Sequence, residues 1–183
     1  GELERRVADA MATVADDGGG VFCKLSSRSP KDSSMCEERA LAAVKHKLGA
    51  QLDGGSALTV NDIYRAVMSA GIEALRLTSA ADVIKCLSSS DRVCDDDIPL
   101  ALSFPQRWSQ HVVLRKWHAI PTSCEWRAFV VDKKITALTQ YFSSAFFADL
   151  ADDGVRQRTL DCINVTFAAV CDRLDAQPPT YVI

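Results

Sequence analysis

Hydrophobic residues recur at helical spacing through the first half of the chain. Leu3, Val7, Met11 and Val14 are separated by Glu, Arg, Asp and Ala, a pattern that predicts an amphipathic helix over residues 2–15. The same spacing predicts helices over 36–48, 63–74 and 80–88, with polar loops at 26–34 and 51–59. Asn61 or Asp62 is the expected cap of the third helix, and Ser79 with Asp82 forms a capping box for the fourth.

A second pattern, rich in β-branched and aromatic residues, predicts strands. It begins early with VFCKL at 21–25 and returns in HVVLRKW (111–117), EWRAFVV (125–131) and ITALTQY (135–141). Only residues 132–134 separate the last two segments, so these should form an antiparallel hairpin. Helices are expected at 144–150 and 155–174, and a further strand begins at 181–183. The order of elements predicts an α+β fold, with antiparallel sheets flanked by helices.

Composition narrows the class of protein. The chain has 183 residues, 21 Lys plus Arg and 24 Asp plus Glu, so its net charge of −3 argues against bulk nucleic acid as a partner and against an anionic membrane surface. No run approaches the length of a membrane span. Seven Cys without a CxxC pair, beside three His, favour free thiols over a disulfide framework or zinc site, and hence a cytoplasmic location.

Charged residues inside otherwise apolar strands are the unusual feature. They are Lys24, Arg115, Lys116, Glu125 and Arg127. Each could face solvent from a one-sided antiparallel sheet. Together, however, they also suit a cradle for an anion such as a phosphate group, because Lys and Arg hold phosphates through charge-assisted hydrogen bonds. The glycines at 18–20 are weak evidence for a phosphate loop, and the acidic run at 95–97 is most simply a solvated helix start.

Two blocks of sequence, GGGVFCKLSSRSPKDS (18–33) and VVLRKWHAIPTSCEWRAFVVDKKITALTQY (112–141), resemble the conserved blocks of the cell division cycle protein 123 family. That family has a strand-Lys-Leu followed by an S-x-P-K/R-D loop, then an LRxW strand, an E-F/W-R-x-F-V strand and a strand ending in Gln. The resemblance implies an ATP-grasp fold, in which two lobes clasp ATP. The lobes would span 1–110, with a helical insertion at about 36–75, and 111–183, comprising the hinge and an incomplete second lobe.

The resemblance also implies roles for individual residues. Lys24 would contact the α- and β-phosphates, and the polar loop with Ser26, Ser29, Lys31 and Asp32 would lie over the triphosphate. Arg115, Lys116 and Trp117 would lie beside the adenine. Glu125 would face the ribose and Arg127 the phosphates, and Gln140 would complete the wall of the nucleotide site. No catalytic residue and no metal ligand is assigned within the chain. The family's magnesium ligands are expected beyond Ile183, so this chain is expected to bind nucleotide weakly and to catalyse nothing.

The function implied by the resemblance is an ATP-binding chaperone that promotes assembly of translation initiation factor 2 through its gamma subunit. The loop reads KLSSRSPKD where well-known eukaryotic members have KLNWSxPRD, which suggests a divergent branch, truncated at both ends. An ATP-grasp ligase or kinase-type enzyme that activates a carboxylate or protein substrate is the alternative, and a nucleotide-free binding module is a third. The residues alone leave all three open.

Overall fold

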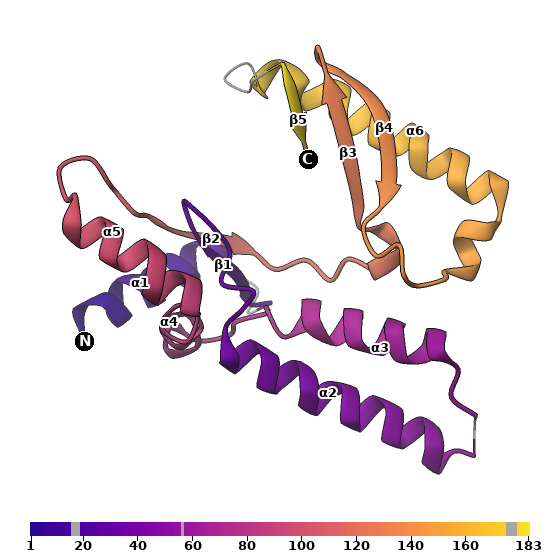
Figure 1. Ribbon diagram of the computed structural model, residues 1–183, viewed down its shortest axis with the longest axis horizontal. Helices are drawn as coiled ribbons and strands as arrows, with labels where there is room; N and C mark the ends of the chain where they lie inside the picture. Colours follow the sequence, from indigo (N-terminus) through magenta and orange to yellow (C-terminus); the bar gives the residue numbers. More distant parts are fainter. Residues whose placement is uncertain (16–18, 56, 175–178) are drawn as a thin grey trace. The chain divides into compact units, whose positions relative to one another are not determined.

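The computed structural model describes residues 1–15, 19–55, 57–174 and 179–183, and the chain forms two compact units, Gly1–Ala119 and Ile120–Ile183 (Figure 1). The sequence placed the division after residue 110. The observed division comes later because strand β2 (Val112–Lys116) pairs with β1 (Val21–Leu25) and so belongs to the first unit.

The first unit consists of a small sheet surrounded by helices. β1 and β2 are antiparallel, with Val21 opposite Lys116 and Leu25 opposite Val112. The helices are α1 (Glu2–Val14), α2 (Ser34–Asp53), α3 (Val60–Glu73), α4 (Ala80–Ser88), the π-helix η1 (Arg92–Asp97) and α5 (Ile98–Ser103). Figure 1 shows α1 and α4 close to the β1–β2 pair.

The core of this unit lies against one face of β1. Val21, Cys23 and Leu25 are buried, whereas the intervening Phe22 and Lys24 are only half-buried. Val7 of α1, Leu77, and Val83 and Cys86 of α4 join the same buried cluster. The amphipathic helix and the buried strand predicted at the N-terminus are therefore confirmed, although Leu3 is exposed.

Gly20 has a structural function at the start of β1. Its φ is +86°, and a Cβ there would lie 2.9 Å from the carbonyl oxygen of Leu77. Leu77 forms an isolated antiparallel bridge with Val21, so the backbone at Leu77 passes close to the backbone at Gly20. This close approach accounts for Gly20 without a ligand, and the preceding residues 16–18 of the glycine-rich turn lie outside the described residues.

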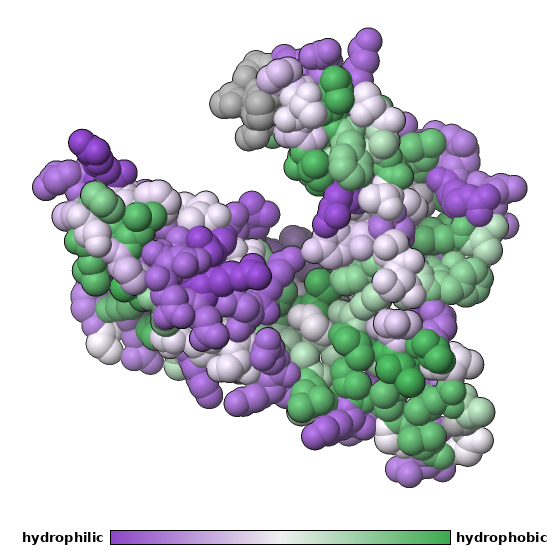
Figure 2. Space-filling model, viewed as in Figure 1, coloured by the Kyte–Doolittle hydropathy of each residue, from purple (hydrophilic) through white to green (hydrophobic). Residues whose placement is uncertain are grey.

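Helices α2 and α3 form a hairpin within the segment expected to be a helical insertion. α2 is longer than predicted and continues to Asp53, so residues 51–53 belong to a helix and not to a loop. The cap of α3 is Thr59, whose hydroxyl accepts a hydrogen bond from the Asp62 backbone, and the predicted cap at Asn61 or Asp62 is wrong. Figure 2 shows apolar side chains over this hairpin, the exposed ones being Leu41, Leu52, Val60, Ile63, Tyr64 and Val67.

The second unit is a three-stranded antiparallel sheet with order β4-β3-β5 and one long helix. Its elements are η2 (Thr122–Cys124), β3 (Trp126–Val131), β4 (Lys134–Gln140), η3 (Ala148–Ala151), α6 (Asp153–Val170), η4 (Cys171–Leu174) and β5 (Thr180–Val182). The predicted hairpin is confirmed, and Asp132 and Lys133 both have positive φ, as a tight two-residue turn requires. The helix predicted over 144–150 is wrong, because only the 3₁₀ turn η3 forms there.

Both units thus combine helices with antiparallel strands, which confirms the predicted α+β class. None of the described helices has the length and apolar character needed to cross a membrane.

Candidate functional site

Lys24 and Arg115 lie side by side on the outer face of the β1–β2 pair. Lys24 is opposite Val113 and Arg115 is opposite Phe22, and directly paired residues of antiparallel strands point to the same side. The two cations are therefore diagonal neighbours on the face that turns away from the buried residues of β1. Neither has a hydrogen-bond or ion-pair partner among the described residues. Two unpaired cations on one small face create a positive potential suited to an anion.

The loop that follows β1 is held in place from its first residue. The Ser26 backbone N–H donates to the His111 carbonyl at 2.9 Å, and the Ser26 hydroxyl accepts from the His111 N–H at 3.2 Å. The same hydroxyl donates to Gln110 Oε1 at 3.0 Å. Ser26 thus extends the β1–β2 pairing by one position beyond Leu25 and Val112. The first part of the predicted phosphate loop is an ordered continuation of the sheet.

The middle of the loop is fixed by an ion pair that the sequence pattern did not predict. Arg28 Nε lies 2.9 Å from Asp97 Oδ2, and Arg28 Nη1 lies 2.8 Å from Asp96 Oδ2. The Asp97 side chain is only 1% exposed, and Gln110 Nε2 donates to its other oxygen at 3.1 Å. A buried carboxylate is costly unless paired and hydrogen-bonded, and Asp97 is both. The interpretation of the acidic run as solvated is therefore wrong for Asp97.

The end of the loop is anchored by Asp32. Its carboxylate accepts hydrogen bonds from the Ser90 hydroxyl at 2.8 Å and from the Arg92 backbone N–H at 3.0 Å. Partial desolvation opposes ionisation, but the hydrogen bonds from Arg92 and Ser90 prevail and hold the pKa of Asp32 below its ordinary value. The next residue, Ser33, hydrogen-bonds Ser89 at 2.7 Å between hydroxyl oxygens. The structure therefore uses Asp32 to fasten the loop to the segment after α4.

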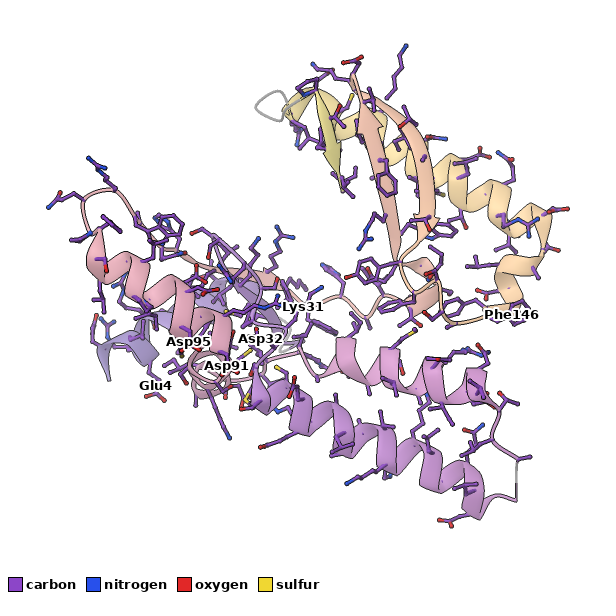
Figure 3. The ribbon with its side chains drawn as sticks, viewed as in Figure 1. Glu4, Lys31, Asp32, Asp91, Asp95 and Phe146 are labelled. Carbon is purple, nitrogen blue, oxygen red and sulfur yellow. The ribbon has the colours of Figure 1, made fainter. Side chains whose placement is uncertain are left out.

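The remaining predicted residues of the first unit differ in exposure. Ser29 is half-buried next to the buried Pro30, and Lys31 is exposed beside Asp32 (Figure 3). Lys116 lies on the opposite side of β2 from Arg115, because its partner Val21 faces the core. Trp117 packs against the core cluster, and its backbone N–H donates to Gly20 at 3.0 Å.

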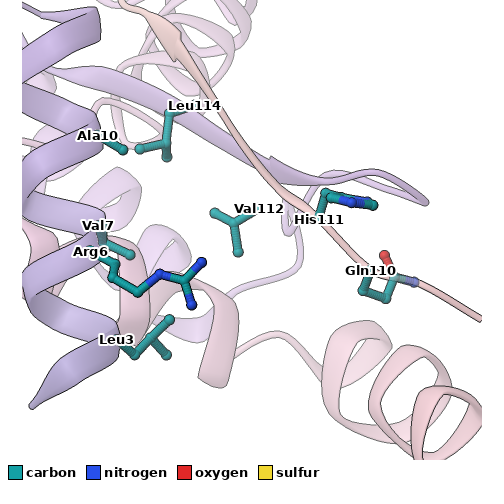
Figure 4. A pocket seen from close by; sticks show the side chains of 8 residues that line it. All are labelled: Leu3, Arg6, Val7, Ala10, Gln110, His111, Val112 and Leu114. Carbon is teal, nitrogen blue, oxygen red and sulfur yellow. The ribbon is translucent and has the colours of Figure 1, made fainter. Parts of the chain in front are cut away.

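A groove lies on the other side of the sheet and is separate from the Lys24–Arg115 face. It has a volume of about 370 Å³ between α1 and β2, and its apolar lining includes Val112 and Leu114 (Figure 4). These two residues are opposite Leu25 and Cys23, which belong to the buried face of β1. The groove therefore opens along the face that packs on α1.

The second unit carries three of the predicted residues. Arg127 is exposed on β3, and its guanidinium lies 5.0 Å from the centre of the Tyr141 ring, a cation–π contact. Glu125 is half-buried, and its carbonyl accepts from the Tyr141 N–H at 2.8 Å. Gln140 is paired with Trp126, so it lies on the opposite face of the sheet from Arg127, and its Nε2 donates to the Thr122 carbonyl at 2.8 Å.

Eight of the eleven predicted residues therefore belong to the first unit and three to the second. Within the first unit, the structure brings Lys24 and Arg115 together on one face and orders the loop from Ser26 to Asp32. The sequence did not single out the residues that order the loop, namely Arg28, Ser90, Asp97 and Gln110. The one clue in the sequence is Arg28 itself, since an arginine inside a short loop often pairs with an acidic residue, here Asp96 and Asp97. Within the described parts of the chain, no group of three His, Cys, Asp or Glu is placed to hold a metal ion.

Comparison with known proteins identifies the family. The D123 family model matches residues 66–177, more than half of the chain, so the chain belongs to the D123 family. Its relatives include cell division cycle protein 123 of Phaeosphaeria nodorum, 30% identical over 128 residues, which cover 70% of this chain and 27% of the relative. A translation initiation factor eIF2 assembly protein of Dictyostelium discoideum is 24% identical over 166 residues, which cover 88% of this chain and 33% of the relative.

Solved structures agree on the fold. Cdc123 from Schizosaccharomyces pombe matches with a TM-score of 0.57 and 23% identity, over 100% of this chain and 59% of that one. A C-terminally truncated form of the same protein matches with a TM-score of 0.55. The chain spans about a third or less of the length of the curated relatives that it matches. The expected resemblance to the cell division cycle protein 123 family is thus confirmed.

Proposed function

We propose that this chain contributes to the assembly of translation initiation factor 2 in the cytoplasm, and that it acts on the gamma subunit of that factor with ATP as a bound ligand. The observation that carries the proposal is the family membership. Relatives from Candida albicans, Dictyostelium discoideum and Sclerotinia sclerotiorum are described as translation initiation factor eIF2 assembly proteins, and they align with 70% to 88% of this chain.

The paired cations support a triphosphate as the ligand of the first unit. Lys24 and Arg115 present an ammonium and a guanidinium from one face, and neither is neutralised by a described carboxylate. A triphosphate offers several anionic oxygens, and charge-assisted hydrogen bonds are about twice as strong as neutral ones. In this proposal, Lys24 and Arg115 bind phosphate oxygens from the strand side. This differs from the position beside the adenine that the resemblance implies for Arg115, because Arg115 shares the face of Lys24.

The ordered loop supports the same ligand by a different argument. Ser26, Arg28 and Asp32 are each held by partners within the protein, so little conformational entropy would be lost when the loop contacts a ligand. Asp32 already uses its carboxylate inside the protein, and Ser29 and Lys31 are the loop residues proposed to contact phosphate. Lys31 adds a third positive charge to the ligand environment.

The adenine and ribose contacts remain part of the proposal. The backbone around Lys116 and Trp117 would border the base, since the Trp117 side chain itself packs against the core cluster. Glu125 and Arg127 of the second unit would serve the ribose and a phosphate. The described residues provide no ligand set for magnesium, so no step of the proposal depends on the metal.

Binding to the purified gamma subunit tests the assembly role. The immobilised chain should bind the gamma subunit from solution, and ATP with magnesium should change the dissociation rate. A matched control is the free alpha or beta subunit, which should not bind. Absence of binding to the gamma subunit, with and without ATP, would refute the proposal. ATP consumption that requires an added carboxylic acid or protein acceptor would favour the ligase or kinase-type alternative.

A further inference from the structure

Two buried thiols of the first unit are in contact. Cys36 lies in the first turn of α2 and Cys86 lies in α4, and their Sγ atoms are 3.6 Å apart. The side chains are 3% and 1% exposed, so each sulfur has the other as a neighbour in a water-poor environment. A disulfide would require the sulfurs to move to bonding distance, about 2.05 Å, with a Cβ–S–S–Cβ dihedral of roughly 90°.

The surroundings make the two thiols unequal. The hydrogen bond from the Cys86 thiol, together with contacts to Ser33 and the charge of Arg39, lowers the pKa of Cys36 to about 7, while burial and Asp82 oppose this. Cys36 also sits near the N-terminus of a 20-residue helix, where the helix dipole favours a thiolate. The pKa of Cys86 is raised by its hydrogen bond to Cys36 and by burial. These effects favour Cys36 as the attacking thiolate and Cys86 as the partner that keeps its proton.

We propose that Cys36 and Cys86 form a redox modification site, in which a small peroxide converts the two thiols into an intramolecular disulfide. The Cys36 thiolate attacks one peroxide oxygen, the O–O bond breaks, and Cys36 becomes a sulfenic acid while the second oxygen leaves as hydroxide. The Cys86 sulfur then attacks the Cys36 sulfur, and hydroxide leaves as the S–S bond forms. The proton of Cys86 and that released by Cys36 convert the two hydroxides to water, so two thiols are oxidised and one hydrogen peroxide is reduced to two water molecules.

The position of the pair gives the disulfide a structural consequence. The N-cap of α2, Ser33, is already joined to the segment after α4 by its hydroxyl contact with Ser89, and the Ser34 N–H donates to the Ser89 carbonyl at 3.0 Å. A disulfide would add a covalent bond between the first turn of α2 and the C-terminal end of α4, close in sequence to these contacts. It would close a segment of 50 residues, which restricts the unfolded chain and stabilises the folded state.

Peptide mapping of the oxidised chain tests the proposal. The folded full chain is treated with hydrogen peroxide, its remaining thiols are alkylated, and it is cleaved with trypsin without reduction. We expect the peptide 32–39, which contains Cys36, to be linked to the peptide 86–92, which contains Cys86. The intact mass should fall by two hydrogen atoms, and the melting temperature should rise and return to its starting value after treatment with dithiothreitol.

Matched variants assign the link. Cys36→Ser and Cys86→Ser should each remove the linked peptide and the rise in melting temperature, whereas Cys94→Ser should retain both. The wild-type map decides the question even if a buried variant fails to fold. Recovery of Cys36 and Cys86 as alkylated free thiols, while the exposed Cys124 and Cys162 are oxidised, would overturn the proposal. A link between other cysteines, or between two chains, would also overturn it.

Discussion

Arg28 Nε lies 2.9 Å from Oδ2 of Asp97, and this ion pair joins the loop after β1 to the π-helix η1 across 69 positions of sequence. The carboxylate is 1% exposed, whereas the Arg28 side chain is 36% exposed. The pair therefore combines a buried acceptor with a donor that reaches it from the surface. The ion pair offsets the cost of burying the Asp97 carboxylate, and it fixes the position of the loop.

Arg28→Met should destabilise the first unit. The substitution leaves Asp97 buried without its cation, and the loss of one member of a buried pair costs about 3–5 kcal/mol. Since the Arg28 side chain is 36% exposed, we expect a loss just below that range, about 2 to 3 kcal/mol, measured as a shift in the urea unfolding midpoint. Arg5→Met removes exposed ion pairs with Glu2 and Asp9 and is the matched control, with an expected effect below about 1 kcal/mol. Equal midpoints for both variants would contradict the account of Asp97.

The ionisation of Asp32 should make the stability of the folded chain depend on pH in the acidic range. Its hydrogen bonds from Arg92 and Ser90 keep its folded-state pKa below the ordinary value. Its stabilising contribution is therefore complete above the unfolded pKa of about 3.9, and it is lost as the pH falls through the lower folded-state value. Asp32→Asn should flatten the fall of melting temperature between about pH 5 and pH 2. The exposed carboxylate Asp53, changed to Asn, is the control. An unchanged acid profile in Asp32→Asn would show that these hydrogen bonds contribute nothing.

Gly20 and Gly49 should respond in opposite directions to the same substitution. Gly20 has a φ of +86° and a Cβ would lie 2.9 Å from the Leu77 carbonyl oxygen, so Gly20→Ala should destabilise the unit by about 1–3 kcal/mol. Gly49 lies inside α2 with nothing within 4 Å of an added Cβ, so Gly49→Ala should stabilise it by about 0.5–1 kcal/mol. Thermal unfolding followed by circular dichroism measures both. A stabilising Gly20→Ala would show that the close approach to Leu77 is absent.

The sequence predicts the local elements well because their signals are local. The alternation in EWRAFVV yields buried Ala128 and Val130 beside exposed Arg127 and Phe129, and the short connection at 132–134 yields the hairpin. The helix predicted at 144–150 is wrong: Phe147 provides no side-chain cap, and only the 3₁₀ turn η3 forms there.

The contacts of the site that the sequence did not predict join segments that are far apart in the chain. Nothing near Asp97 distinguishes it from the exposed Asp96, and only the arrival of Arg28 and Gln110 from distant segments buries it. Likewise, Asp32 has the chemistry of a ligand residue in the sequence, and only the placement of Ser90 and Arg92 shows its anchoring role. The sequence groups Lys24 and Arg115 in one possible anion cradle, but only the register of β1 with β2 shows that the two share a face.

The central claim is that the Lys24–Arg115 face binds the phosphates of ATP, and calorimetric titration with ATP and magnesium tests it most directly. The double variant Lys24→Ala, Arg115→Ala should bind ATP at least about tenfold more weakly than the wild-type chain, since each charged hydrogen bond contributes about 1.5–3 kcal/mol. Lys45→Ala, Lys85→Ala removes the same charge from exposed helical positions and should bind like the wild type. Equal affinity of the wild type and the Lys24, Arg115 variant for ATP would contradict the claim, and so would equal weakening by both double variants.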